Sequence, residues 1–272
     1  LAEEVADRAR RSCGAQVFEG RCVPYGEANV WWPVAEALRH ACGVGTDDPL
    51  RIARQRCEEA VVAATGCPPS DPEVGRVVAG LVHLMGYEGP LHAIEPRRAR
   101  EEATRSVVAF VEASATARPV IVVLSDLHGA DEGGLGLIEV LVDRLSRSRL
   151  MIVATARPAL LERWTPPTGR HNTLLVNVDP LDRASTSSLL DALTVEPLAP
   201  ELREALLDRS GGNPFFLEEL VALLAEAGPD ANGTDAPDGI ELPDTLRGLV
   251  AARIDALDDL ERATVQDAAV WG

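Results

Sequence analysis

The stretch VIVVLSD (residues 120–126) decides the fold of this chain. Its first five residues are apolar throughout, which is the pattern of a strand buried on both faces of a sheet. Asp126 follows soon after, so the strand would hold a carboxylate at its carboxyl end. Ligands of open α/β sheets bind at that edge, where a carboxylate can hold Mg²⁺ or orient water at a phosphate. The pattern alone leaves a second interpretation open, in which Asp126 only caps a turn.

Further strand patterns alternate with helical patterns along the chain. Short apolar runs at 16–22, 151–156 and 174–178 are predicted as strands, and residues 97–117 and the segment after Asp131 as amphipathic helices. Alternation of this kind predicts an α/β fold with a parallel sheet and right-handed crossovers. After residue 180 the strand patterns stop, and helices are predicted at 183–193, 200–210, 214–227, 246–257 and 260–270.

Charge and composition exclude two kinds of chemistry. The 272 residues carry a formal net charge of −17, which argues against a sequence-independent grip on nucleic acid by this segment. All 26 basic residues are arginine, so any reaction or binding loop that needs a lysine is absent from this chain. A GC-rich genome is the simplest general cause of that bias, and the exclusion holds whatever the cause.

The cysteines and the apolar runs bear on location. The cysteine count is odd and no two form a C-x-x-C pair, so neither a disulfide framework nor a zinc site is expected. Free thiols of a reducing compartment are the better interpretation. No apolar run reaches the length of a membrane span, and no secretory signal is present, so we expect a cytoplasmic location without a membrane partner. The five are Cys13, Cys22, Cys42, Cys57 and Cys67.

Several segments, in order, resemble one protein family. The run VIVVLSDLHGADE (120–132) resembles the Walker B element of STAND ATPases, the AAA-like ATPase domains of LuxR-type regulators and cyclase-linked signalling proteins. Similar segments are GRCVPYGE (20–27) with WP (32–33) and AEAL (35–38), ATARP (154–158), GGNPFFLEEL (211–220), and LPDTL (242–246) with ARIDAL (252–257). Together they cover nearly the whole chain.

The resemblance implies a domain organisation. Residues 1–180 would form an α/β core of P-loop NTPase type, with a helical insertion at about 34–117. Residues 181–228 would form a helical lid, 229–241 a polar linker, and 242–272 the start of a winged-helix region. Within the lid, Gly211 and Gly212 are predicted to end one helix, and Asn213 and Pro214 to begin the next.

The resemblance also implies a site for ATP or ADP with Mg²⁺. Asp126 would be the Walker B acid and metal ligand, with Ser125 as a weak second ligand. Thr155 and Arg157 would lie beside the γ-phosphate, and Pro214 would pack on the adenine. The alternatives are that Arg157 is only a surface charge and that Pro214 is only the first-turn proline of a helix. Asp131 is better explained as a helix N-cap than as a ligand, and His128 as a structural histidine.

Two departures from the family pattern matter. The family has two adjacent acids at the strand end, whereas Ser125 stands first here and brings no charge; Gly129 also replaces a common tryptophan. No Gly-x-x-x-x-Gly-Lys-Ser/Thr loop is present, although that loop cradles the phosphates. Because Leu1 is not Met and lies in a helical pattern, we expect the first strand and its loop upstream of it. A true loss of the loop is the alternative.

The family order of strands, 5-1-4-3-2, has a structural consequence. Without the first strand, the strands at 151–156 and 174–178 would lack their shared neighbour, so we expect an exposed edge and poor stability. The function implied is a nucleotide-dependent signalling switch that answers an unidentified protein partner or small-molecule inducer and that could oligomerise. The alternative is a non-catalytic scaffold that kept the fold.

Overall fold

A computed structural model describes residues 1–22, 32–166, 172–194, 197–227 and 257–271, together with 248, 250, 251, 253 and 254. The chain divides into two compact units, Leu1–Leu174 and Leu175–Gly272, each with its own apolar core. No described helix is both long enough and apolar enough to cross a membrane.

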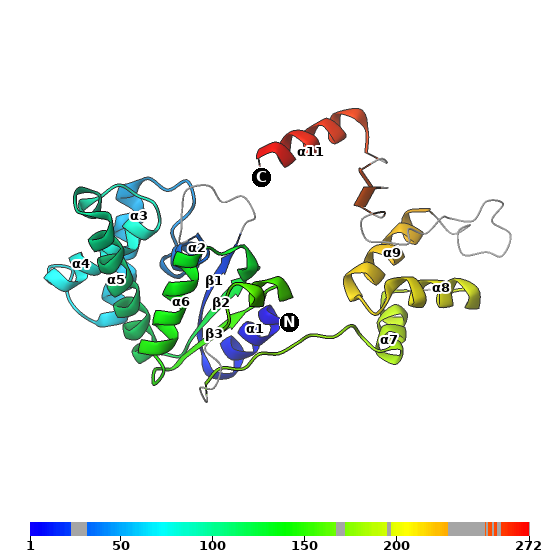
Figure 1. Ribbon diagram of the computed structural model, residues 1–272, viewed down its shortest axis with the longest axis horizontal. Helices are drawn as coiled ribbons and strands as arrows, with labels where there is room; N and C mark the ends of the chain where they lie inside the picture. The colour runs from blue at the N-terminus through cyan, green and yellow to red at the C-terminus, as the bar shows by residue number, and fades with distance from the viewer. Residues whose placement is uncertain are drawn as a thin grey trace. The chain divides into compact units, whose positions relative to one another are not determined.

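A parallel three-stranded sheet forms the centre of the first unit (Figure 1). The strands are β1 (Gln16–Arg21), β2 (Val120–Ser125) and β3 (Leu150–Ala154), in the order β1-β2-β3. Val120 of β2 lies opposite Gln16 of β1 and Leu150 of β3. The five apolar residues of β2 are all buried, as its unbroken apolar run requires. The predicted α/β fold with a parallel sheet is confirmed, and the observed order agrees with the 2-3-4 part of the family order.

Helix α1 (Ala2–Cys13) packs against one face of the sheet (Figure 1). Ala6 is fully buried and shares a small core with Val17, Ile121 and Val123 of β1 and β2. The helix ends at Gly14, whose left-handed backbone (φ 63°) turns the chain into β1. Small residues on this helix face let it approach the sheet closely.

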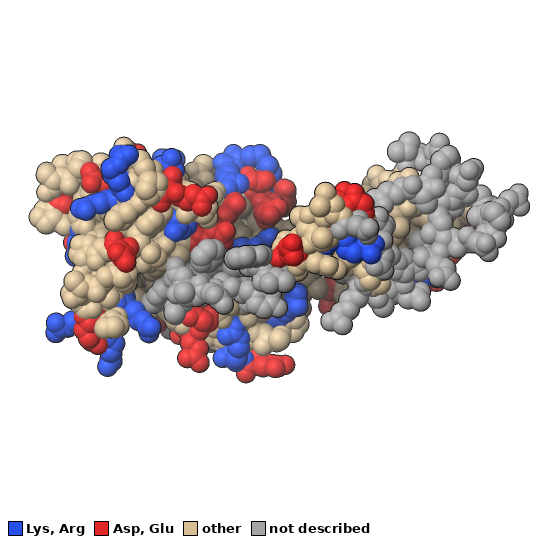
Figure 2. Space-filling model, turned by 90° about the horizontal axis from the view of Figure 1, so that it is seen from above, with Lys and Arg blue, Asp and Glu red and all other residues tan. Residues whose placement is uncertain are grey.

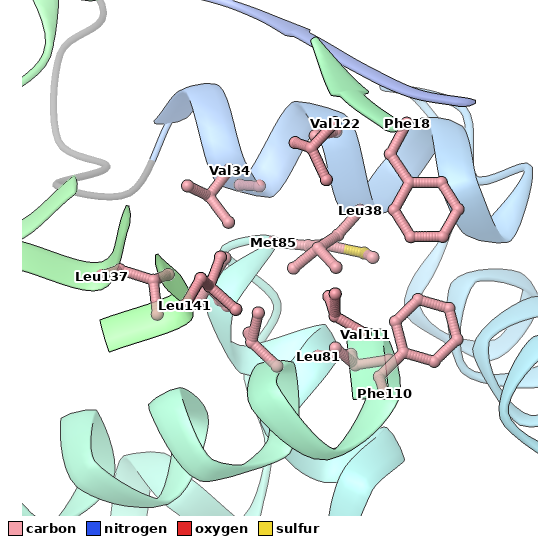
Figure 3. Packing of buried hydrophobic residues seen from close by; sticks show 14 of the residues in the cluster. Phe18, Val34, Leu38, Leu81, Met85, Phe110, Val111, Val122, Leu137 and Leu141 are labelled. Atoms are coloured by element: carbon pink, nitrogen blue, oxygen red, sulfur yellow. The ribbon is translucent and has the colours of Figure 1, made fainter. Parts of the chain in front are cut away.

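The opposite face of the sheet carries the main core (Figure 3). Helices α2 (Trp32–Cys42), α5 (Pro96–Ala117) and α6 (Glu132–Arg144) contribute apolar side chains to it. Phe18 of β1 stacks on Phe110 of α5, with ring centroids 6.0 Å apart. Leu38, Met85 and Val122 converge beside them in Figure 3. This packing fixes the orientation of β2 and therefore of the residues that follow it.

A helical layer fills the chain between α2 and β2. It contains α3 (Leu50–Thr65), α4 (Pro72–Leu84), the short 3₁₀ helix η1 (Pro90–Ala93) and α5. The Asp71 carboxylate accepts a hydrogen bond from the Glu73 amide and caps α4. Arg39 ties α2 to the end of α4, because its guanidinium donates to the Met85 carbonyl at 2.6 Å and to the Tyr87 hydroxyl at 3.1 Å.

The prediction of a strand at 174–178 is wrong. The segment forms no strand, and its apolar side chains are exposed to solvent, Leu174 at 85% and Val178 at 76%. A strand is held by hydrogen bonds to a neighbouring strand, and no described strand pairs with this segment. β3 is an edge strand of the described sheet, and its Met151 side chain is half exposed.

The second unit is helical. Its helices are α7 (Arg183–Leu193), α8 (Pro200–Ser210), α9 (Pro214–Ala227) and α11 (Asp259–Trp271). Gly211 ends α8 in a left-handed conformation, and the Asn213 side chain accepts from the Phe216 amide at 3.3 Å to cap α9, as the sequence predicts. The predicted linker at 229–241 lies outside the described residues, as does half of the predicted helix at 246–257. The buried leucines of α7–α9 are Leu190, Leu206, Leu207, Leu217, Leu220 and Leu224.

Charged side chains of both signs mix on the molecular surface. On the face in Figure 2, arginines lie among aspartates and glutamates and form no separate positive field. Many are paired in the described structure, for example Arg76 with both Glu73 and Glu102.

Candidate functional site

The candidate site lies at the carboxyl edge of the sheet. Because the three strands are parallel, their last residues, Arg21, Ser125 and Ala154, meet at one edge. Arg21 lies directly opposite Ser125, and the Cys22 amide donates to the Ser125 carbonyl at 2.9 Å. The chain then leaves β2 through Asp126 and the short 3₁₀ helix η2 (Leu127–Gly129).

Asp126 holds an unusual backbone conformation. Its φ of 58° is left-handed, and it is the one non-glycine residue with positive φ in the described part of the chain. Such a conformation costs on the order of 1 kcal/mol and persists where surrounding contacts impose it. Here the Asp126 amide faces the Thr155 hydroxyl at 3.3 Å, and the Leu127 amide donates to the Thr155 carbonyl at 2.8 Å. The contacts turn the chain sharply and leave the carboxylate at the edge.

Arg21 and Glu36 complete the edge, although neither is predicted as a site residue from the sequence. The Arg21 guanidinium approaches the Asp126 carboxylate, with Nε 3.6 Å from Oδ2. The backbone amide of the same arginine donates to the Glu36 carboxylate on α2. Both residues lie in segments that resemble the family, GRCVPYGE and AEAL, so the sequence contained a signal for them. It did not show that the two segments meet at the sheet edge.

Cys22 is buried just behind these charges. Burial raises the pKa of its thiol to about 11, and the nearby carboxylates of Asp126, Glu36 and Asp131 add to that effect. The Arg163 guanidinium opposes them and lowers the pKa. Arg21 and Arg163 partly offset these three acids, so the edge combines carboxylates with guanidinium groups.

The raised pKa of Cys22 predicts a pH dependence of stability. The folded protein keeps this proton to about pH 11, whereas the unfolded thiol loses it near pH 9.0, so its stabilising effect is complete below pH 9 and fades as pH rises through 11. Chemical unfolding between pH 8 and 11 should show wild type losing up to about 3 kcal/mol more than Cys22→Ala. Parallel pH curves for the two proteins would exclude this effect.

The turn after Asp126 is held by side chains that hydrogen-bond to its main-chain groups. Arg163, which follows the 3₁₀ helix η3 (Pro158–Glu162), donates to the carbonyls of His128 and Ala130, both at 2.6 Å. The Asp131 carboxylate caps α6 by accepting from the Gly134 amide, which confirms its prediction as an N-cap. His128 Nδ1 is buried without a hydrogen-bond partner among the described residues, so one nitrogen of this ring is left unsatisfied.

The structure brings some predicted site residues together. Asp126, Ser125 and Thr155 share the edge, and Arg157 follows two residues after Thr155, exposed at the start of η3. Pro214 is the exposed first residue of α9 in the second unit and is described there by itself. Carboxylate and hydroxyl oxygens are suitable ligands for Mg²⁺, which keeps several waters and binds through few protein groups. Asp126 and Ser125 fit that role.

Comparisons with known proteins bear on the family of this chain. The chain is 29% identical to an uncharacterized protein of Rhizobium meliloti (strain 1021) over 161 residues, which are 57% of this chain and 15% of that protein. The chain thus spans a small part of that relative's length. No solved structure matches. A family model described as an AAA ATPase domain matches residues 1–153, the part that contains α1, the whole helical layer, β1, β2 and most of β3. The chain therefore belongs to the AAA ATPase domain family.

Proposed function

We propose that this chain is part of a nucleotide-dependent signalling switch of the STAND ATPase type. Membership of the AAA ATPase domain family implies nucleotide binding, usually with Mg²⁺. The observation that supports the finer proposal best is the left-handed Asp126, whose carboxylate is placed at the end of a fully buried strand next to Thr155. Stored backbone strain of this kind is concentrated at functional sites.

Each residue of the edge has a role in the proposal. Asp126 orients the attacking water or holds Mg²⁺, and Ser125 reaches the ion through its hydroxyl or through water. Thr155 keeps Asp126 in position and lies beside the terminal phosphate. Arg157, exposed and close in sequence, detects that phosphate through its guanidinium. Pro214 of the second unit contacts the adenine.

The second unit would transmit the nucleotide state. We assign residues 1–180 to the ATPase core, 181–228 to a helical lid, 229–241 to a linker and 242–272 to the start of a winged-helix region. In such a switch a bound nucleotide biases the packing of lid and core, and an inducer or protein partner shifts the balance. Oligomerisation of the whole protein and a cytoplasmic location belong to the same proposal.

A non-catalytic scaffold is the second candidate. Ser125 replaces one of two acids, and the 272 residues contain neither a lysine nor a phosphate-binding loop. Both facts weaken hydrolysis by this chain. Whether the gene encodes a Gly-x-x-x-x-Gly-Lys-Ser/Thr stretch upstream of residue 1 separates the two candidates, because such a stretch favours the switch.

An Asp126→Asn variant tests the proposed role of the carboxylate. In the protein expressed with its preceding coding sequence, we expect Mg²⁺-dependent ATP hydrolysis to fall about a hundredfold, since a positioned carboxylate contributes on that order. Asp47→Asn is the matched control, because Asp47 is exposed and distant in sequence from the edge. Equal hydrolysis by wild type and Asp126→Asn would refute the role.

A further inference from the structure

Arg21 lies beside the acid on which the proposed function depends. It ends β1 directly opposite Ser125 of β2, and its Nε atom is 3.6 Å from Oδ2 of Asp126. Both side chains of this ion pair are open to solvent, Arg21 at 65% and Asp126 at 51% exposure. Within the described part of the chain, Asp126 is the one ion-pair partner of the Arg21 guanidinium group.

The backbone of Arg21 is fixed, whereas its side chain can move. The Arg21 amide donates to the Glu36 carboxylate on α2, and the Cys22 amide donates to the Ser125 carbonyl at 2.9 Å. These bonds hold the end of β1 to α2 and to β2. Exposed ion pairs are weak, so the guanidinium group can leave the Asp126 carboxylate without disturbing the fold.

The strand register shows why the guanidinium group meets this particular acid. Val17 of β1 and Ile121 of β2 pack on α1, and the alternation of side chains along a strand places Arg21 and Ser125 on the same face of the sheet. A carboxylate at position 125 would stand directly opposite Arg21. Ser125 carries no charge there, so the nearest carboxylate across the two strands is that of Asp126.

We propose that Arg21 is a positioning residue that pairs with the Asp126 carboxylate and must release it before the carboxylate can ligate a divalent cation. The inference rests on the proposed function, in which Asp126 holds Mg²⁺. The guanidinium group stands beside the oxygen that a hard cation would take as its ligand, and its positive charge opposes a second cation at that place. Arg21 would therefore make filling of the edge depend on nucleotide phosphates, which supply further oxygen ligands.

Titration of Mn²⁺ into the full-length protein saturated with ADP tests this competition. Mn²⁺ prefers the same oxygen ligands as Mg²⁺, and electron paramagnetic resonance measures how much of it stays free. We expect Arg21→Gln to bind Mn²⁺ about fivefold more tightly than wild type, because loss of one exposed ion pair changes an affinity on that order. Arg21→Lys keeps the charge, so its affinity should stay close to that of wild type.

Arg10→Gln is the matched control. Arg10 lies on α1, on the same face of the sheet, and pairs with Asp7 and Glu19 instead of the edge. Its replacement removes the same charge from the protein, and screening should keep the Mn²⁺ affinity within about twofold of wild type. The expected gain of affinity in Arg21→Gln also excludes a merely structural role, because a damaged edge would bind the ion less tightly.

The outcomes separate this inference from the proposed function. Equal Mn²⁺ binding by wild type and Asp126→Asn overturns the proposed function and this inference with it. Weaker binding by Asp126→Asn, together with wild-type affinity in Arg21→Gln, overturns the inference alone. An equal gain in Arg10→Gln overturns it too, because the effect would then come from net charge. Tighter binding confined to Arg21→Gln supports it.

Discussion

Replacing Gly20 with alanine is expected to lower the free energy of unfolding by about 3 kcal/mol, the upper end for overpacked sites. Gly20 is buried near the end of β1, where α2 crosses it. An added Cβ would lie 2.0 Å from the Pro33 carbonyl oxygen and 2.9 Å from the Ala37 nitrogen. Both are backbone atoms that cannot rotate away, so α2 itself must move. Since α2 carries Glu36, the substitution should also disturb the sheet edge.

Gly75→Ala is the matched control for this prediction. Gly75 lies on the exposed side of α4, where an added Cβ meets nothing within 4 Å. Alanine in a helix interior is favoured over glycine, so the control should gain about 0.5–1 kcal/mol. Urea unfolding of the three proteins measures both effects. A similar small change at the two positions would mean that β1 and α2 are not packed as described.

Leu81→Ala is expected to lower the free energy of unfolding by about 3 kcal/mol, within the range for buried leucines. Leu81 of α4 is fully buried in the main core, in the cluster of Figure 3. Truncation removes its burial energy and leaves a cavity between helices and sheet that cannot fully collapse. Denaturant titration should show a lower midpoint with an unchanged slope, because the exposed area on unfolding hardly changes.

Leu50→Ala supplies the comparison for the core. Leu50 begins α3 and is 41% exposed, so the same truncation should change stability by no more than about 0.5 kcal/mol. Equal losses at Leu50 and Leu81 would contradict the placement of the core between the helical layer and the sheet.

Local patterns predicted much of the fold. The apolar run at 120–124 gave the buried central strand, because only a strand covered on both faces lacks polar positions. Glycine, capping and proline residues at 211–214 predicted where α8 ends and where α9 begins, since these residues act on their immediate neighbours. The strand predicted at 174–178 failed for the opposite reason. Its sequence is suited to a strand, but a strand also needs a neighbour to pair with, and no described strand pairs with this segment.

The central acid of the candidate site was predicted from the sequence, but the residues around it were not. Asp126 and Thr155 follow separate strands, and the parallel order brings them together as expected. The contact of Arg21 with Asp126 joins segments over a hundred residues apart, and the left-handed backbone at Asp126 is held by Thr155, which follows a different strand. No local pattern encodes such a contact.

The central claim is that this chain supplies the Walker B edge of a nucleotide site. Its most direct test is calorimetric titration with Mg²⁺-ATP of the protein expressed with the coding sequence that precedes Leu1, beside the 272-residue chain. We expect saturable binding by the longer protein and much weaker binding by the chain, which has no lysine or phosphate-binding loop. A folded longer protein that binds no nucleotide would contradict the account.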